Sequence, residues 1–328
     1  MGENSETPSI FDPRFQTEDL TFKPDEMTEC RCGRKNPPNR LKCMYCGLEL
    51  ELKAENTASI KPILRKLEAW ESGFNVIFRE TDGNAEIGKA AALLSVEATD
   101  LSAILNAGSP LPVARVESTT EANILIAGLS KLNLKCSMIS DIELDADKLP
   151  IRLSNIEFCE GGIAVTDFNT RQITEIDLAL IVPGLLTLSK TDSLEKKRRH
   201  GKTKLLDESE ISSDEIVIDI YNRRDPRGYR IYPAGFDFSC LGVDKGMIAV
   251  ENMRLLIVAL KEHAPHAKLV SDYAKVRHAL GSIWEVESRK DPKGLQRSGF
   301  GKVEFGSVSS TSNLQQFTKY SRLQWHLL

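Results

Sequence analysis

The sequence has no apolar run that approaches the ~18 residues needed to span a bilayer. Its first residues, Met-Gly-Glu-Asn-Ser-Glu-Thr-Pro, also lack the basic start, the apolar run and the small-residue cleavage site of a secretory signal. The hydrophobic content of 41% is that of a soluble globular protein. These observations predict a cytoplasmic protein with no transmembrane segment.

A disulfide framework is missing as well. The chain has seven cysteines, an odd number, and three of them, Cys136, Cys159 and Cys240, are scattered in apolar or mixed surroundings. In a reducing compartment, such a set favours a metal site together with free thiols over disulfide bonds.

Strong charge of one sign is absent, since the formal net charge is −4 and the pI is near 5.9. The whole molecule therefore has no field that attracts nucleic acid or an anionic membrane, and such binding must come from local basic patches. The basic run at residues 196–204 is followed at once by acidic residues, so we interpret it as part of a solvated loop.

Catalytic motifs are also lacking. Cys240 has no Gly-x-Ser-x-Gly elbow around it, and the segment that ends at Lys302 lacks the spacing of a phosphate-binding loop. His263 and His266 flank a proline at the end of an expected helix, without carboxylate or cysteine partners nearby in sequence. The chain is therefore predicted to be non-enzymatic, with no small-molecule substrate evident.

What the sequence does have is a cysteine cluster, formed by Cys30, Cys32, Cys43 and Cys46. Tetrahedral Zn²⁺ in a structural site takes four thiolates from two short turns, and Cys43-x-x-Cys46-Gly47 is such a turn, with a glycine free to adopt positive φ. The cluster predicts one structural zinc ion. Free thiols, a redox pair or an iron–sulfur cluster are the alternatives.

The pattern Cys-x₃-Asn-x₆-Cys-x₂-Cys at Cys32, Asn36, Cys43 and Cys46 resembles the small zinc finger of the Ran-binding-protein type. In that family, the asparagine braces the two cysteine turns. The chain departs from the family in having one residue between Cys30 and Cys32, where the family has two to four, and in lacking the tryptophan just upstream.

Fingers of this family bind single-stranded RNA or protein partners. No acidic residue lies between Cys30 and Cys46, and a cation cluster beside an aromatic ring can follow phosphates and stack a base. Solvation of a module with little core is the other interpretation. The candidate RNA or partner contacts are Arg34, Lys35, Asn36, Arg40, Lys42 and Tyr45.

Residues 1–26 are polar and acidic and predict a disordered tail, followed by the zinc finger at 27–48 and a small α/β domain at 59–145. An amphipathic helix is expected at 62–73, since Ile63, Leu64, Leu67 and Trp70 repeat at helical spacing. Strands at 74–78, 113–116 and 135–139 and helices at 85–97, 100–106 and 118–132 then give the order β-α-α-β-α-β.

Within this domain, the run from Ile104 to Pro110 and the cap Ser118-Thr-Thr-Glu121-Ala122 resemble the C-terminal domain of the bacterial ribosomal stalk protein. The resemblance implies that fold and a protein-docking surface over about residues 73–141. The glycine- and lysine-bearing helical hairpin that contacts translation factors in the family is replaced here by residues 96–103, Val-Glu-Ala-Thr-Asp-Leu-Ser-Ala. Recruitment of translation factors is therefore not expected.

Residues 150–287 predict a β-rich α+β domain, with short strands, a charged loop at 191–215, a strand at 236–238 and helices at 250–263 and 270–286. The order of elements resembles a pleckstrin-homology-type barrel with its C-terminal helix. Residues 288–328 are expected to be a flexible tail, in which Phe317, Tyr320, Leu323 and Trp325 are able to dock on a surface.

Together these features predict an α+β multidomain protein of the bacterial type with zinc as its only cofactor. We expect a non-enzymatic adaptor or regulator that mediates protein–protein interactions. An RNA- or ribosome-associated factor that uses the basic finger is the first alternative, and an uncharacterised enzyme is the second.

Overall fold

The computed structural model describes residues 27–38, 40–50, 66–68, 70–160, 162–197, 203–223, 225–299 and 302–328. The chain divides into two compact units, Met1–Lys61 and Pro62–Leu328. The predicted tail at 1–26 lies outside the described residues. None of the described helices has the length and apolarity needed to cross a membrane.

The first unit is a small module around the cysteine cluster. Strand β1 (Thr28–Glu29) pairs antiparallel with β2 (Lys35–Asn36), and an isolated bridge joins Lys42 to Glu49. Among the described residues of this unit, the buried apolar side chains are those of Cys30, Cys43 and Leu50. So small a core cannot offset the entropy of ordering the chain, and such modules need a metal or a disulfide.

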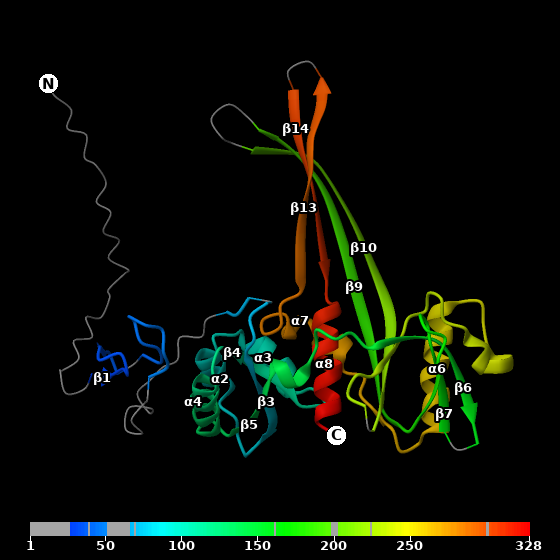
Figure 1. Ribbon diagram of the computed structural model, residues 1–328, viewed down its shortest axis with the longest axis horizontal. Helices are drawn as coiled ribbons and strands as arrows, with labels where there is room; N and C mark the ends of the chain where they lie inside the picture. The colour runs from blue at the N-terminus through cyan, green and yellow to red at the C-terminus, as the bar shows by residue number, and fades with distance from the viewer. Residues whose placement is uncertain are drawn as a thin grey trace. The chain divides into compact units, whose positions relative to one another are not determined.

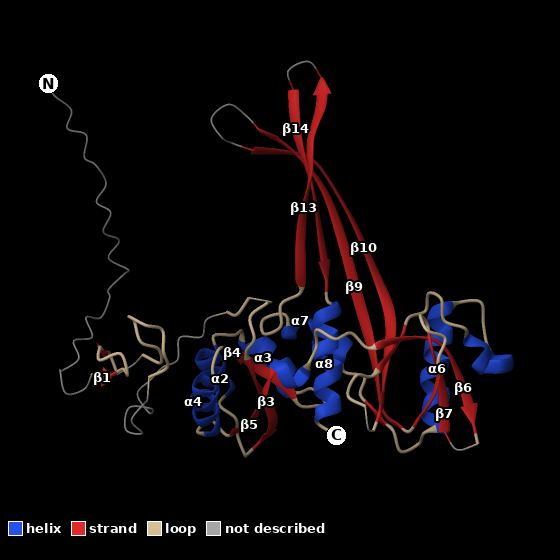
Figure 2. Ribbon diagram, in the orientation of Figure 1, coloured by secondary structure: helices blue, strands red, loops and turns tan. Residues whose placement is uncertain are grey.

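The second unit begins with a three-stranded antiparallel sheet in the order β4-β3-β5, with helices packed against it (Figure 2). The predicted β-α-α-β-α-β order is confirmed. Its elements, with the short helix that follows, are β3 (Phe74–Thr81), α2 (Ile87–Leu94), α3 (Ala98–Leu105), β4 (Leu111–Val116), α4 (Thr119–Ser130), β5 (Leu134–Ser140) and α5 (Asp141–Leu144).

The predicted cap of α4 is present in modified form. The Ser118 hydroxyl accepts a hydrogen bond from the Glu121 N–H at 3.2 Å, while the Glu121 carboxylate accepts from the N–H of Glu117, one residue before the cap. The helix predicted at 62–73 is wrong for its described part, because residues 66–68 and 70–73 are not helical. Leu67 is buried, whereas Trp70 is 81% exposed.

The rest of the second unit contains a nine-stranded sheet together with further helices. The strand order is β13-β14-β9-β10-β11-β6-β7-β8, with β12 beside β9. The path is open, since no pairing joins its ends, β13 and β8, among the described residues. Its first strands are β6 (Ile151–Cys159), β7 (Gly162–Asp167), β8 (Ile173–Ile176), β9 (Leu178–Lys197), β10 (Thr203–Asn222) and β11 (Tyr229–Ile231).

The elements after β11 are the 3₁₀ helix η1 (Phe238–Asp244), α6 (Ala249–His263), β12 (Lys268–Leu269), α7 (Tyr273–Leu280), β13 (Glu287–Gly299), β14 (Lys302–Ser312) and α8 (Leu314–His326). The helix predicted at 250–263 is confirmed as α6, with Met253, Leu256 and Leu260 buried. Of the strand predicted at 236–238, only an isolated bridge of Asp237 to Asn155 is present, because η1 begins at Phe238, and the helix predicted at 270–286 is shorter.

The prediction of a charged loop at 191–215 is wrong for the described residues, because β9 and β10 run through most of it as a long antiparallel hairpin. β14 pairs with the other edge of β9, from Glu304 opposite Lys196 to Ser312 opposite Leu188. Backbone hydrogen bonds to strands on both sides stabilise β9 whatever the polarity of its side chains. These strands extend away from α7 and α8 (Figure 1).

The prediction of a flexible tail at 288–328 is also wrong, because this segment forms β13, β14 and α8. Phe317, Tyr320 and Leu323 follow one another at three-residue intervals along α8 and are buried. The Phe317 ring lies against Gly184 of β9, where any added Cβ would approach the ring to 2.4 Å. Close packing therefore fixes α8 on the sheet.

The segments 59–145 and 150–287 were predicted as two domains, but from Pro62 onward they belong to one unit and share a core. The cluster includes Val76, Leu101 and Leu125 from the first segment and Val182, Trp284 and Phe317 from the rest of the chain. A second cluster lies between the sheet and α6. The boundary at 145–150 thus does not separate two independent cores.

Candidate metal centre

Four sulfur atoms meet in the first unit. The Sγ atoms of Cys30, Cys32, Cys43 and Cys46 all lie within 4.8 Å of one another, with 3.5 Å between Cys30 and Cys46 and 3.6 Å between Cys32 and Cys43. Sulfurs at the corners of a tetrahedron ~2.3 Å from a zinc ion are ~3.8 Å apart, whereas a disulfide needs ~2 Å. The four sulfurs are thus placed so that they could hold a metal ion, and all four cysteines are free.

Two short turns bring the sulfurs together. In the first, the Gly33 N–H donates to the Cys30 carbonyl at 2.8 Å, and in the second, the Gly47 N–H donates to the Cys43 carbonyl at 3.0 Å. Both glycines have positive φ, +78° and +74°. The predicted role of Gly47 is confirmed, and Gly33 has the same role in the first turn.

Asn36 joins the two turns and is completely buried. Its Nδ2 donates to the Arg34 carbonyl at 3.0 Å and approaches the Cys43 sulfur at 3.5 Å, while its Oδ1 accepts from the Met44 N–H at 2.8 Å. Asn36 therefore positions a metal-binding side chain through hydrogen bonds and is not itself exposed to a partner.

The thiols of the cluster differ in acidity. Burial raises the pKa of Cys43, but the N–H groups of Tyr45 and Cys46 and the amide of Asn36 outweigh it and lower the pKa to about 6. For Cys46, the N–H of Leu48 lowers the pKa, but burial and the neighbouring thiols raise it to about 12. The Cys43 thiol thus loses its proton more readily than the Cys46 thiol, and a cation is needed to hold four thiolates together.

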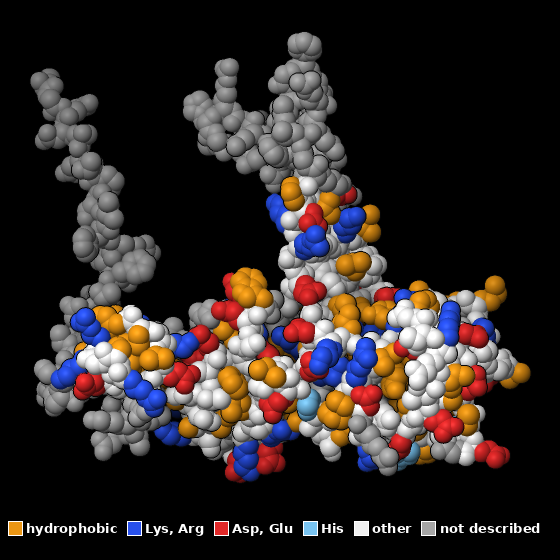
Figure 3. Space-filling model, in the orientation of Figure 1, with side chains coloured by type: hydrophobic (Ala, Val, Ile, Leu, Met, Phe, Trp, Pro, Cys, Tyr) orange, Lys and Arg blue, Asp and Glu red, His pale blue; other side chains and the backbone are white. Residues whose placement is uncertain are grey.

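The outer surface of the second turn is apolar and flanked by cations. Met44, Tyr45 and Leu48 are each more than half exposed, and the Arg34 guanidinium lies 5.3 Å from the centre of the Tyr45 ring. Arg34, Lys35 and Arg40 are exposed and Lys42 is half-buried. Figure 3 shows apolar and basic side chains together on the visible face of this unit.

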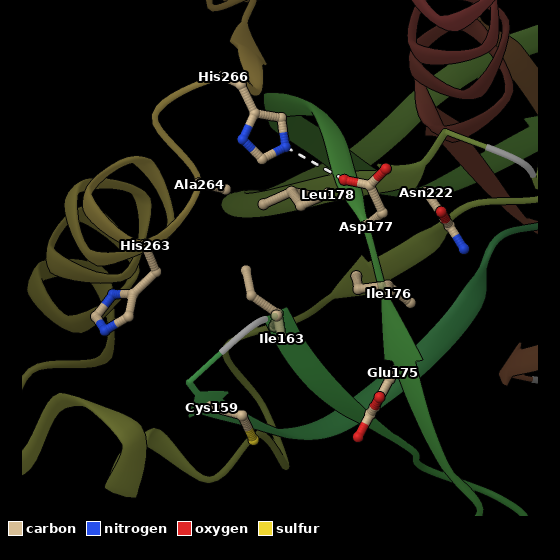
Figure 4. Close-up of a pocket in the computed structure, with 11 residues that line it drawn as sticks. Cys159, Ile163, Glu175, Ile176, Asp177, Leu178, Asn222, His263, Ala264 and His266 are labelled. Atoms are coloured by element: carbon tan, nitrogen blue, oxygen red, sulfur yellow. Dashed lines mark hydrogen bonds and ion pairs between the residues drawn. The ribbon is translucent and has the colours of Figure 1, made fainter.

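The histidines singled out in the sequence border a cavity of about 480 Å³ in the second unit (Figure 4). His266 Nε2 lies 3.2 Å from Asp177 Oδ1. His263 Nδ1 lies 2.9 Å from the Ala259 carbonyl, and its ring stacks on Phe158. Sequence reasoning missed the carboxylate partner of His266, since Asp177 is 89 residues away and no local signal links them.

The polar groups of this cavity do not converge. The side chains of His263, His266 and Cys159 point in different directions in Figure 4. Cys240 lies in η1, where burial raises the pKa of its thiol and disfavours the nucleophilic thiolate. Among the described residues, the cysteine cluster is the one group of three or more candidate metal ligands within reach of one another.

Fold and site together define a mixed α/β protein that carries a four-cysteine module able to bind a metal ion. No family model, no curated protein and no solved structure matches the chain.

Proposed function

We propose that residues 27–50 form a zinc-stabilised recognition module and that the protein is a non-enzymatic adaptor. The supporting observation is the set of four sulfurs within 4.8 Å of one another, from two glycine-ended turns braced by Asn36. An all-thiolate set leaves no open position for catalysis, so the ion would act on folding. Iron, the other metal of all-cysteine sites, is distinguished by its colour and by elemental analysis.

The partner-binding surface of the proposed adaptor is the outer face of the second turn, with Met44, Tyr45 and Leu48. Each of these three apolar side chains is exposed, although the core of the module contains few apolar side chains of its own. Large apolar side chains on a rigid turn give contact area at little entropic cost when a partner covers them. The flanking cations favour a partner with acidic residues at the edge of its contact surface.

The test compares the full-length chain with a variant in which Met44, Tyr45 and Leu48 are all changed to serine. Both proteins are first shown to hold equal zinc, and each is then cross-linked to its partners in the native host and analysed by mass spectrometry. We expect specific proteins to be cross-linked to the original chain and not to the variant. These proteins should still be recovered with the original chain after nuclease treatment. A partner set that does not differ between the two proteins contradicts the proposal.

RNA binding is the second candidate function, because an exposed Tyr45 ring with Arg34 beside it is suited to stacking on a base. The assay is fluorescence anisotropy of a short single-stranded RNA at several salt concentrations. Binding that weakens steeply with salt and is lost in Arg34→Ala and Tyr45→Ala favours this function. Partners that disappear on nuclease treatment lead to the same conclusion.

A further inference from the structure

Lys319 of α8 borders a small cavity of about 70 Å³ in the second unit. Its chain neighbours Thr318 and Tyr320 are buried, and Lys319 itself is half-buried. The apolar part of the cavity lining comes from Leu67 and Trp284. Its polar lining consists of Arg115, Asp147, Glu285, Glu287, Gln315 and Gln316.

The ammonium group of Lys319 has no hydrogen bond and no ion pair within 4.0 Å among the described residues. Two of the charged groups that line the cavity have other partners: Arg115 pairs with Asp141 at 2.7 Å, and Glu285 pairs with Lys66. Several other lysines of this unit have a carboxylate partner, as Lys135 does with Glu80 at 2.9 Å. A half-buried amine without a partner is better accommodated when it carries no charge.

The electrostatic surroundings act in the same direction. Burial lowers the pKa of Lys319, and the Arg115 guanidinium lowers it further, while Asp141, Asp147 and Glu287 oppose these effects without cancelling them. A desolvated lysine next to a second cation is a common way to obtain a nucleophilic amine near neutral pH.

We propose that Lys319 is a site of covalent acylation by small activated acyl donors of the acyl phosphate class. The uncharged nitrogen attacks the acyl carbon and forms a C–N bond, and the bond from carbon to the phosphate oxygen breaks. The phosphate leaves with the electron pair and takes up the proton released by nitrogen. The product is an amide, and no oxidant or reductant is needed.

The cavity limits the size of the acyl group. Since a single water needs about 10–15 Å³ on the same measure, a space of about 70 Å³ holds an acetyl group with room to spare but not a long acyl chain. Acylation would remove the ammonium charge from the cavity. The packing of α8 against the rest of the second unit is therefore expected to become more stable. Lys319 would thus connect acyl-donor levels to the stability of α8.

The test exposes the full-length protein to acetyl phosphate near pH 7 and follows each lysine by mass spectrometry. Lys275, whose side chain is 80% exposed, is the reference. We expect Lys319 to react at least about threefold faster than Lys275, because a lowered pKa increases the uncharged fraction. Equal or slower reaction of Lys319 overturns the proposal. Lys319→Arg verifies the assignment of the modified peptide.

Two further measurements show whether the reactivity of Lys319 comes from its folded environment or from its neighbours in sequence. In concentrated urea, the two lysines should react at similar rates, and a preference that persists there contradicts the proposal. Glu287→Gln should make Lys319 react faster, because the Glu287 carboxylate raises the pKa of the amine. Glu251→Gln on α6 is the matched control and should leave the rate unchanged. A Glu287→Gln protein that reacts no faster also counts against it.

Discussion

The indole Nε1 of Trp284 donates a hydrogen bond to Asn75 Oδ1 over 2.7 Å, although the two residues are 209 positions apart. Both side chains are buried, and the Asn75 Nδ2 donates in turn to Asp141 Oδ1 at 2.9 Å. This hydrogen bond joins the segment after α7 to β3, the central strand of the three-stranded sheet. Since buried polar groups are costly when unpaired, this contact favours one arrangement of the two segments.

Trp284→Phe should destabilise the second unit by about 2 kcal/mol, because it leaves the Asn75 oxygen buried without a donor. The measurement is urea unfolding followed by far-UV circular dichroism. Trp70→Phe is the control and should change stability by less than about 0.5 kcal/mol, since Trp70 is 81% exposed. Equal effects of the two substitutions would contradict the role given to the hydrogen bond.

The buried ion pair of Arg230 and Asp219 should be sensitive to removal of one partner. The Arg230 Nε and Nη2 atoms donate to the two carboxylate oxygens at 2.6 and 2.8 Å, and Nη2 also donates to Thr318 of α8 at 3.1 Å. Asp219→Ala should cost about 3–5 kcal/mol in urea unfolding, because it leaves the guanidinium buried and unpaired.

The double substitution Asp219→Leu with Arg230→Met is the matched control for the ion pair. It removes both charges and keeps much of the volume, so its stability should return to within about 1 kcal/mol of the original protein. A double variant as unstable as Asp219→Ala would show that packing, not the unpaired charge, dominates.

Purified full-length protein that has never met a chelator should contain about one equivalent of zinc by elemental analysis. Cys43→Ser should lower the content to less than about half an equivalent, because it removes one of the four thiolates. Cys159→Ser, at an exposed cysteine of the second unit, should leave the zinc content unchanged. A metal-free original protein, or iron in place of zinc, would contradict the proposal.

Asn36→Ala should weaken zinc binding by about 10–100-fold without removing a ligand, since side chains that hold metal ligands in place have effects of this size. The physical reason is the loss of the bonds from Asn36 to Arg34 and Met44, which join the two turns. Competition with a chromophoric chelator measures the change. Lys35→Ala, at the exposed neighbour, is expected to bind zinc as the original protein does.

Stability should also depend on pH through His326, near the end of α8. Partial desolvation of the ring lowers the pKa of His326 in the folded chain, and the nearby Glu143 carboxylate opposes this only in part. As pH falls through the usual range of histidine, the unfolded chain therefore binds a proton more readily than the folded one, and stability decreases.

The measurement is the urea midpoint of the original protein and of His326→Gln at several pH values between about 5 and 8. The original protein should lose more stability toward the acidic end than the variant does. Parallel pH curves for the two proteins would rule out a contribution of His326.

Local signals accounted for a large part of the fold. The helical spacing of Met253, Leu256 and Leu260 predicted α6, and the apolar runs with the Ser118 cap predicted the β-α-α-β-α-β order. The boundaries were less accurate where a competing local hydrogen bond decided them. Residues 236–238, for example, read as a strand, but the Asp237 side chain accepts from the Ser239 N–H at 3.0 Å and begins η1.

The four-cysteine cluster was predictable from the chain because its thiols come from two short turns close in sequence. Spacing and glycine placement are sufficient to bring such thiols together. The same reasoning could not pair His266 with Asp177 or place Lys319 in a cavity, because these relationships depend on strands and helices that meet only after folding.

The sequence by itself thus determined the cysteine cluster, with Asn36 as its brace, and the elements of the three-stranded sheet. Only the tertiary structure decided that residues 191–215 extend β9 and β10, that α8 is buried, and that the two segments after Pro62 share one core. The physical reason is that hydrogen bonds from β14 and the contact of Phe317 with Gly184 come from partners more than a hundred residues away, which no local pattern encodes.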